Sequence, residues 1–342
     1  MNPREIVLAQ IRHRETPVVP YTVNCDNIAA ELDAHYGNAQ WRDRITPYIL
    51  RVAAVETGRR LPTGQPGYER DPYGSEWRVD RLPFHLEIPA LPKPSFKGHR
   101  WPKPEEFFLG PKETAEAKKF CREHKGEHFL RAALGWGLFE SSWGLRGFEN
   151  VLFDVVAEVD FYEELLDRIT DQFLAYIEHT CATLPEADAI MFGDDWGDQR
   201  GVIVGPDRWR QLFKPRYAKL YAAAHKHGKL VINHSCGSII DIIPDLIEIG
   251  LDVMESVQPE ARDMNPYALK KQFGDKIAFW GCLGSQLTLA FGTPAEVKAE
   301  VRHLRKEMAV GGGYILAPAK PLQQGMPIAN AAALLDELAL NG

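Results

Sequence analysis

The chain lacks the features of disulfide-rich secreted proteins, membrane-spanning proteins and nucleic-acid-binding proteins. Its five cysteines are scattered and contain no Cys-x-x-Cys pair, so we expect reduced thiols and no disulfide framework. No apolar run reaches the ~18 residues of a membrane span, and the first residues carry no cationic and apolar signal segment. A net charge of -7 argues against nucleic acid as the main partner. We therefore expect a cytoplasmic protein that binds neither membrane nor nucleic acid.

What is present is the composition of a globular protein of enzyme size. The chain has 342 residues, of which 45% are hydrophobic and 25% are charged, as in average globular proteins. This length would allow two small domains, but α/β barrels of similar length fold as one domain with an insertion. We expect a single barrel domain over residues 1–342.

Strand-like apolar runs alternate with helix-length segments along most of the chain. The runs lie at residues 18–23, 128–134, 189–192, 230–232, 252–254, 276–280 and 313–316. Such alternation predicts a parallel sheet, either doubly wound or closed into a barrel. No Gly-x-Gly-x-x-Gly follows the first strand, so the pattern favours a TIM-type (β/α)8 barrel over a dinucleotide-binding sheet. The eighth strand is expected within an insertion or near Leu138-Phe139.

The insertion is the segment of about residues 51–110. It is rich in proline and glycine, and short stretches such as Ser75-Glu-Trp-Arg-Val79 lie between its turns. This pattern predicts an inserted N-terminal lobe of hairpins and loops that roofs the barrel pocket.

The run that starts at Leu230 ends by presenting an imidazole and a thiol two residues apart. Residues i and i+2 of a strand project from the same face, so His234 and Cys236 are expected to point together beyond the strand. Histidine nitrogen and cysteine sulfur are zinc ligands. The pair alone has little specificity, because a buried cysteine and a hydrogen-bonded core histidine explain it equally well.

Chemistry in a TIM-type barrel sits at the carboxyl ends of the strands, so the residues after each apolar run are candidates. These residues are polar or aromatic: Trp136, Glu140, Trp143, Asp194, Asp195, Trp196, Gln199, Glu255, Gln258, Cys282 and Lys320. Zinc takes nitrogen, sulfur and carboxylate oxygen, and a catalytic site keeps one position open. His234 and Cys236 are the predicted ligands, and Cys282, Glu140 and Asp195 compete for the third position.

Structural roles compete with some of these assignments. Strand alternation lets only one of Asp194 and Asp195 face inward, and capping of the following helix or pairing with Arg200 and Arg208 is an alternative for both, more so for Asp194. Glu140 also has a candidate ion-pair partner in Arg146. His225 and His227 lie near a helix end that Gly228 terminates, which favours a cationic helix C-terminus over a ligand pair.

Several longer motifs resemble the uroporphyrinogen decarboxylase superfamily. They are Gly193-Asp-Asp-Trp-Gly-Asp-Gln199, Ala224-His-Lys-His-Gly228, His234-Ser-Cys-Gly237, Gly274-Asp-Lys-Ile-Ala-Phe-Trp-Gly281 and Gly311-Gly-Gly-Tyr-Ile-Leu-Ala-Pro318. The resemblance covers about residues 125–340 and implies a TIM-type barrel with an N-terminal excursion. True decarboxylases of this family carry an arginine-rich N-terminal signature, whereas this chain has Tyr21-Thr-Val-Asn-Cys-Asp-Asn27. Decarboxylation of uroporphyrinogen is therefore not expected.

The other branch of the superfamily contains corrinoid-dependent methyltransferases that hold zinc through a His-x-Cys pair and a later cysteine. His234 and Cys236 fall on that pair, whereas Ala317-Pro-Ala-Lys320 stands at the turn of the later cysteine. The resemblance implies zinc as a Lewis acid and cobalamin on a partner corrinoid protein. We place Cys282 in the ligand set and Asp195, Glu140 and Lys320 in catalytic roles, with the third ligand open.

The substrate pocket is expected to be aromatic and polar. Its predicted lining is Tyr21, Trp136, Trp143, Trp196, Gln199 and Gln258, together with Trp280. Such rings suit a methoxylated aromatic or a methylamine as methyl donor. Two other functions remain open: a metal-free lyase or decarboxylase acting on a smaller acid, and a noncatalytic tetrapyrrole- or corrinoid-binding module.

Overall fold

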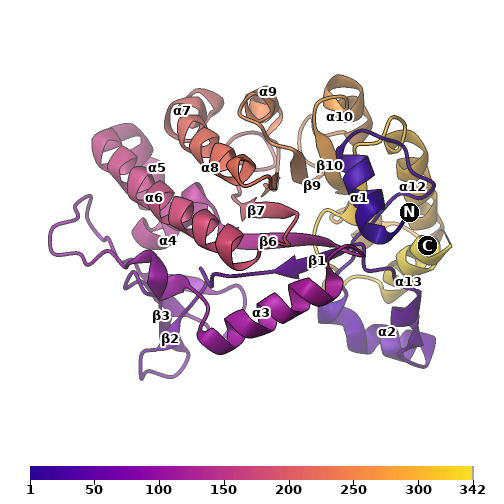
Figure 1. Cartoon of the computed structure of the whole chain (residues 1–342), viewed down its shortest axis with the longest axis horizontal. Helices are drawn as coiled ribbons and strands as arrows, with labels where there is room; N and C mark the ends of the chain where they lie inside the picture. Colours follow the sequence, from indigo (N-terminus) through magenta and orange to yellow (C-terminus); the bar gives the residue numbers. More distant parts are fainter. Residues whose placement is uncertain (341–342) are drawn as a thin grey trace.

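Seven parallel strands form one curled sheet in the computed structural model, which describes residues 1–340 (Figure 1). In order across the sheet they are β1 (Ile49–Val52), β6 (Phe129–Trp136), β7 (Ala189–Gly193), β8 (Leu230–His234), β9 (Val253–Val257), β10 (Ala278–Leu283) and β11 (Tyr314–Pro318). A parallel bridge between Tyr21 and Leu316 adds the N-terminal segment beside β11. The predicted TIM-type architecture is confirmed.

Most of the predicted strands lie where the apolar runs place them. The exception is β1, which begins just before the proline- and glycine-rich segment and pairs with β6. Leu138-Phe139, the other place considered for a strand, instead begins helix α4 (Leu138–Arg146). The 18–23 run contributes only the Tyr21 bridge and no full strand.

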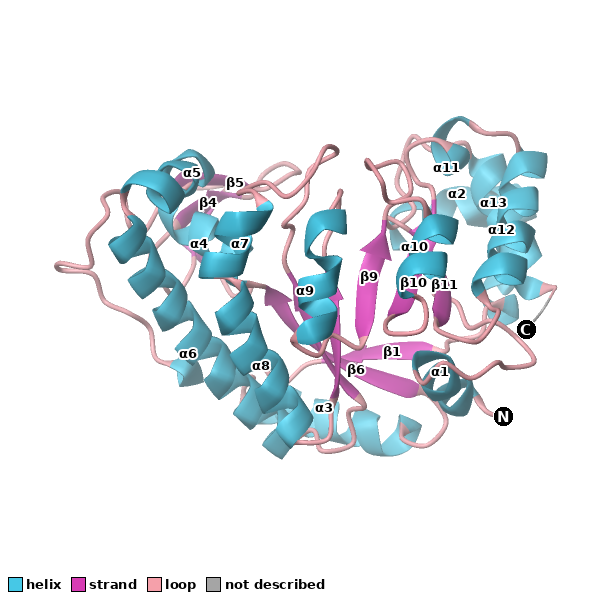
Figure 2. Cartoon of the chain, turned by 90° about the horizontal axis from the view of Figure 1, so that it is seen from above, coloured by secondary structure: helices cyan, strands magenta, loops and turns pink. Residues whose placement is uncertain are grey.

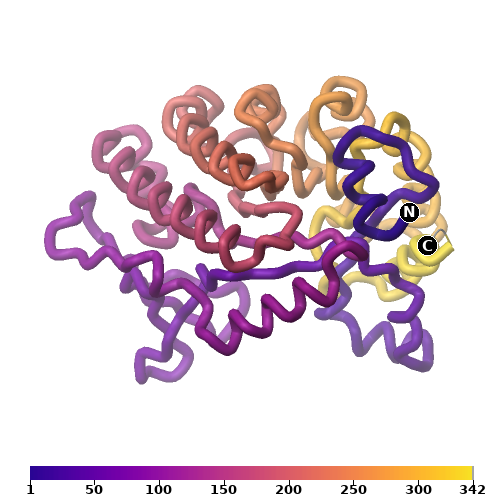
Figure 3. Tube along the Cα trace, viewed as in Figure 1, coloured from indigo at the N-terminus to yellow at the C-terminus, as the bar shows by residue number. Residues whose placement is uncertain are grey.

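Helices cover the outer face of the sheet, as Figures 1 and 3 show. They are α1 (Pro3–Ile11), α2 (Ala29–Tyr36), α3 (Pro111–His124), α4, α5 (Phe148–Ala157), α6 (Val159–Thr183), α7 (Pro206–Leu212), α8 (Lys214–Lys226), α9 (Ile243–Glu248), α10 (Pro266–Phe273), α11 (Thr288–Phe291), α12 (Pro294–Met308) and α13 (Ile328–Ala339). Every residue of β10 and β11 is buried, as expected for parallel strands covered on both faces. No helix within residues 1–340 is both long and apolar enough to cross a bilayer.

Local signals in the sequence set several helix ends. Thr293 caps α12 in a capping box, accepting from the Glu296 amide while the Glu296 carboxylate accepts from the Thr293 amide. Gly37 ends α2 at φ 72°, a left-handed conformation that glycine adopts without strain. These residues therefore fix where α12 begins and where α2 ends.

The predicted lobe is a small antiparallel sheet of β2 (Leu61–Pro62), β3 (Tyr68–Arg70), β4 (Glu76–Arg78) and β5 (His85–Ile88). Trp77 of β4 is buried, and its ring packs against Trp136 and Trp143 of the barrel with centroid separations of 5.7 and 6.4 Å. Figure 2 shows β4 and β5 beside α4 and α5, at the end of the barrel toward which β9 points. The lobe therefore borders the barrel mouth.

Candidate metal centre and its cavity

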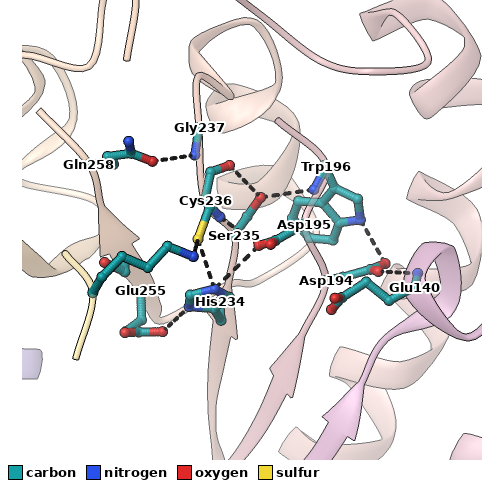
Figure 4. A network of polar contacts seen from close by, with 12 residues as sticks. Glu140, Asp194, Asp195, Trp196, His234, Ser235, Cys236, Gly237, Glu255 and Gln258 are labelled. Atoms are coloured by element: carbon teal, nitrogen blue, oxygen red, sulfur yellow. Dashed lines mark hydrogen bonds and ion pairs between the residues drawn. The ribbon is translucent and has the colours of Figure 1, made fainter. Parts of the chain in front are cut away.

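His234 and Cys236 meet at the carboxyl end of β8, as the strand spacing predicts. His234 is the last residue of the strand, and its Nε2 lies 3.2 Å from the Sγ of Cys236 (Figure 4). The thiol is buried and the imidazole is partly buried. Two potential ligands therefore face one point on a rigid strand edge.

Asp195 supplies a third donor atom. Its Oδ1 lies 3.3 Å from His234 Nε2 and accepts a 2.9 Å hydrogen bond from the Cys236 amide. One donor atom from each of Asp195, His234 and Cys236 lies within 4.8 Å of the other two. Ligands of a tetrahedral zinc ion with bonds of about 2.0–2.3 Å stand roughly 3.3–3.6 Å apart, and the distances from His234 Nε2 to the other two atoms, 3.2 and 3.3 Å, are close to this spacing. Three protein ligands would leave a fourth position for a substrate.

Glu255 orients the imidazole from behind. Its Oε2 lies 2.5 Å from His234 Nδ1, and Figure 4 shows His234 between Glu255 and Asp195. Burial alone would lower the pKa of His234, but the charge of Glu255 and the hydrogen bonds that the ring donates to Asp195 and Glu255 raise the pKa well above its usual value. A carboxylate behind a ligating histidine fixes the orientation of the ring, and an ion that binds Nε2 would displace the proton from that nitrogen.

The carboxylate of Asp195 is held in its charged form. Burial favours the neutral acid, but the hydrogen bond and charge of His234, together with the Cys236 amide, outweigh it and hold the pKa of Asp195 well below its usual range. Zinc prefers such an ionised oxygen ligand. The electrostatics of Asp195 therefore suit the ligand role.

Lys320 reaches the same group from the loop after β11. Its Nζ lies 2.6 Å from Cys236 Sγ, and its amide donates to Ser285 Oγ at 2.9 Å. Burial would lower the pKa of Lys320, but the contact with Cys236 and the charge of Asp195 raise it. The site therefore holds an ammonium group directly beside the thiol of Cys236.

Asp194, the neighbour of Asp195, has a structural role. It is fully buried, and its carboxylate accepts hydrogen bonds from the amides of Phe139 and Glu140 at 2.9 and 2.8 Å. Tyr217 Oη and Trp196 Nε1 donate to the same carboxylate at 2.6 and 2.8 Å. Burial raises the pKa of Asp194 to about 6 against these bonds. Asp194 therefore accepts hydrogen bonds from the backbone amides in the first turn of α4, which precedes it in the chain. Through Tyr217 it also connects α4 to α8.

Glu140 lies in the same region as a neutral acid. Burial, with the charges of Asp194 and Asp195 in addition, raises the pKa of Glu140 to about 9. It does not pair with Arg146, whose guanidinium binds Asp154 with an Nε to Oδ2 distance of 2.7 Å. A carboxyl group that keeps its proton at neutral pH is a weaker metal ligand than Asp195 and a potential proton donor.

Cys282 is not brought to this group. It is completely buried in β10, and the charges that act on its thiol belong to Glu300 of α12 and Lys270 of α10. Burial raises the pKa of this thiol. Cys282 therefore faces the helical layer, and of the three candidates for the third position Asp195 lies beside His234 and Cys236.

The predicted aromatic lining is divided between the core and the lobe. Tyr21 and Trp196 are buried, where Tyr21 Oη accepts from the Thr46 amide and the Trp196 ring packs on Trp209 and Tyr217. Trp136, which is 38% exposed, packs on Trp143 and lines a cavity of about 360 Å³ beneath the lobe. Of the predicted rings, Trp136 lines this cavity and Trp280 lines a second cavity beside His234.

The glutamines also differ from each other. Gln258 is buried, accepts from the Gly237 amide through Oε1 at 3.1 Å, and has no partner for its Nε2 among the described residues. Gln199 is exposed, and its backbone carbonyl accepts from Arg262. Gln258 therefore shapes the His234-Ser-Cys-Gly237 turn, while the Gln199 side chain has no such role.

A cavity of about 500 Å³ opens beside His234. Its lining includes Arg51, Arg131, His234, Glu255, Trp280 and Lys320. The two arginines were not among the predicted site residues, although Arg131 interrupts the apolar run 128–134 and so carried a signal. Trp280 donates through Nε1 to Thr22 Oγ1 at 2.9 Å, which holds its indole at the cavity wall.

Comparisons with known proteins agree with this architecture. The sequence profile of the family described as Uroporphyrinogen decarboxylase (URO-D) matches residues 135–339, well over half of the chain. A comparison with curated proteins finds no match. Among solved structures, a methyltransferase from Methanosarcina mazei is 20% identical with a TM-score of 0.72, and the alignment covers 99% of this chain and 98% of that one. This likeness shows a shared fold.

A more distant similarity is to 3-keto-D-glucoside 4-epimerase from E. coli. It is 15% identical with a TM-score of 0.42, over 67% of this chain and 84% of that chain.

Proposed function

Because the chain belongs to the uroporphyrinogen decarboxylase family, we propose that it is a zinc-dependent methyltransferase that moves a methyl group between a small substrate and a corrinoid protein. The observation that carries the proposal is the Asp195, His234 and Cys236 group at the carboxyl end of the barrel. The full-length similarity in fold to a methyltransferase supports the reaction class. The departure of Lys320 from the family pattern leaves Asp195 as the third ligand.

The residues of this chain have distinct roles in such a reaction. His234, Cys236 and Asp195 would hold zinc, which supplies Lewis acidity to the heteroatom that gains or loses the methyl group. Glu255 keeps the His234 ring in place, and Glu140 carries a proton near the ligand Asp195. The cavity beside His234 holds the substrate between Trp280 and the charged wall.

The methyl carrier is proposed to be cobalamin bound to a separate corrinoid protein. The argument for it is the family resemblance together with the position of the site at the barrel mouth. A methyl group moves directly between a heteroatom and cobalt, so the partner must approach this mouth. The lobe borders the mouth through Trp77 and Trp136, and a docked carrier would contact it.

One observation favours a second candidate, a metal-free lyase or decarboxylase that acts on a small acid. The ammonium of Lys320 contacts Cys236 directly and provides a positive charge without any metal. In this alternative, Lys320 and the cavity arginines would bind the acid, and Glu140 would supply the proton that replaces carbon dioxide. Turnover would then need neither zinc nor corrinoid.

Zinc content and metal-dependent turnover separate these two functions. Freshly purified protein and a His234→Ala/Cys236→Ala variant are compared by elemental analysis, with His35→Ala/Cys181→Ala as a control that removes the same residue types elsewhere. We expect close to one zinc per chain in the wild type and the control, and little in the site variant. Negligible zinc in all three proteins rejects the methyltransferase proposal.

The reaction itself is tested with methylcobalamin and cob(I)alamin in place of the partner's cofactor. Methoxyaromatics, methylamines, thiols and folates are offered as substrates, and transfer is followed by the cobalamin spectrum. We expect transfer that a chelator abolishes and zinc restores. Chelator-insensitive release of carbon dioxide from a small acid, without any cobalamin, would establish the lyase instead.

A further inference from the structure

Arg51 and Arg131 occupy matched positions on neighbouring strands. They are register partners in the parallel pair of β1 and β6, so their side chains leave the sheet on the same face. Both line the cavity that also contains His234 and Glu255. Arg51 is exposed at this cavity and Arg131 is partly buried. We call the side of the cavity formed by these two guanidinium groups the cationic wall.

Neither guanidinium forms an ion pair with a carboxylate within residues 1–340. The side-chain contact of Arg131 is to the Met191 sulfur at 2.6 Å, and its guanidinium carbon lies 5.6 Å from the Trp280 ring centroid. Arg146, which is buried elsewhere in the barrel, contrasts with it, because Asp154 neutralises that group through two hydrogen bonds. A partly buried cation without a counter-ion is unfavourable unless a bound anion neutralises its charge.

The carboxylate that acts on the charge of Arg131 also binds His234. Glu255 is close enough to act on the charge of Arg131, but its Oε2 is bound to His234 at 2.5 Å. Desolvation lowers the pKa of Arg131, the charge of Glu255 opposes this, and the charge of Arg51 adds to the lowering. The cavity therefore contains more positive charge than its own acids neutralise.

We propose that Arg51 and Arg131 bind the carboxylate of the methyl-bearing substrate, so that the substrate class is a small aromatic acid rather than a methylamine. The inference rests on the proposed methyltransferase function and specifies its substrate. Planar guanidinium groups bind carboxylates through paired hydrogen bonds, and two adjacent guanidinium groups repel a quaternary ammonium ion. Trp280 offers an apolar ring face beside Arg131, and a cavity of about 500 Å³ accommodates one substituted ring.

Binding of three matched probes tests this assignment without any methyl transfer. The probes are 4-methoxybenzoate, its neutral amide 4-methoxybenzamide and the cation 4-methoxybenzylamine, each titrated calorimetrically into the zinc-loaded protein. The variants are Arg51→Gln, Arg131→Gln and the double variant, with Arg200→Gln as a control, because Arg200 is an arginine on an exposed loop. Thermal unfolding and zinc content confirm that each variant is folded and loaded.

We expect the carboxylate to bind at least tenfold more tightly than the amide and the amine to bind most weakly. Arg131→Gln should weaken carboxylate binding by about 10- to 100-fold and leave amide binding within twofold. Equal affinity for the acid and the amide, a carboxylate preference that survives in the double variant, or no binding of the acid at millimolar concentration would overturn the proposal.

The binding result is separable from the proposed function. Arginine-dependent carboxylate binding without demethylation of 4-methoxybenzoate by cob(I)alamin supports the assignment of the cationic wall and counts against the methyltransferase. Demethylation of neutral methoxyaromatics at the same rate as of acids supports the methyltransferase and overturns the assignment of the wall.

Discussion

The Nζ of Lys320 lies 2.6 Å from the Sγ of Cys236, although 84 residues separate the two in the chain. The ammonium occupies one side of the sulfur that a metal ion would otherwise approach. Lys320 and a divalent cation therefore compete for the same sulfur, because each places a positive charge against it.

Removing this competitor should strengthen zinc binding. We expect Lys320→Met to lower the zinc Kd by about tenfold, because a side chain of similar length no longer places a charge on Cys236. Lys320→Cys should lower the Kd further, because it replaces the charge with a potential sulfur ligand on the same side of the site. Competition against a chromophoric chelator at fixed pH measures both values, and Lys298→Met on the surface of α12 is the control. Weaker zinc binding in Lys320→Met would show instead that the lysine supports the metal.

The position of Glu255 behind His234 leads to a second prediction. Glu255→Gln keeps the shape of the side chain but removes the charge that orients and polarises the imidazole. We expect zinc affinity to fall by about 10- to 100-fold while the folded structure is kept, as is typical when an outer partner of a ligating histidine is changed. Chelator competition gives the affinity and circular dichroism the fold. An exposed change of the same type, Glu164→Gln, should leave the affinity unaltered, and a Glu255→Gln variant with wild-type affinity would refute the orienting role.

The buried carboxylate of Asp194 leads to a prediction about stability. Four N–H or O–H groups donate to this carboxylate. In Asp194→Asn one accepting oxygen becomes an NH2 group, which then faces donors instead of acceptors. We expect a loss of about 2–4 kcal/mol in unfolding free energy at neutral pH. Tyr217→Phe removes one of these donors and also the acceptor of the Leu138 amide, so it should cost about 1–3 kcal/mol. Urea titration gives both values, and an Asp194→Asn variant as stable as the wild type would contradict this account.

The sequence predicts the architecture well because strand and helix periods are local signals. The runs at 189–192 and 313–316 became β7 and β11, and His234 and Cys236 converge because strand geometry alone places i and i+2 together. β1 escaped prediction because its four residues include an exposed arginine that faces the cavity instead of a continuous apolar pattern.

The remaining parts of the site depend on the curvature of the sheet, which no local pattern encodes. Lys320 contacts Cys236 although β9 and β10 separate β11 from β8 in the sheet, so the contact forms across the barrel mouth. Cys282 was a plausible ligand because it follows an apolar run. The face of β10 from which its side chain projects, however, depends on the φ of 74° at that residue. The choice of Asp195 over Cys282 therefore needed three-dimensional coordinates.

The neutral Glu140 leads to a prediction about pH. Its pKa is raised from 4.5 to about 9, chiefly by burial, so the folded protein keeps a proton that the unfolded chain releases near its ordinary pKa. Folding stability is therefore lost as the pH rises from about 4.5 to about 9, and a side chain that never ionises avoids this loss. In chelator-treated protein, we expect Glu140→Gln to match the wild type at pH 4.5 and to be more stable by about 1–3 kcal/mol at pH 8.

Urea unfolding of both proteins at half-unit pH steps measures this difference. The exposed Glu164→Gln serves as the control, and its stability should follow that of the wild type at every pH. The raised pKa of Asp194 is common to all three proteins, so it cancels in the difference. Parallel pH profiles for Glu140→Gln and the wild type would mean that Glu140 ionises normally. Glu140 would then be a charged carboxylate beside Asp195, and it would regain its place as an alternative third ligand for zinc.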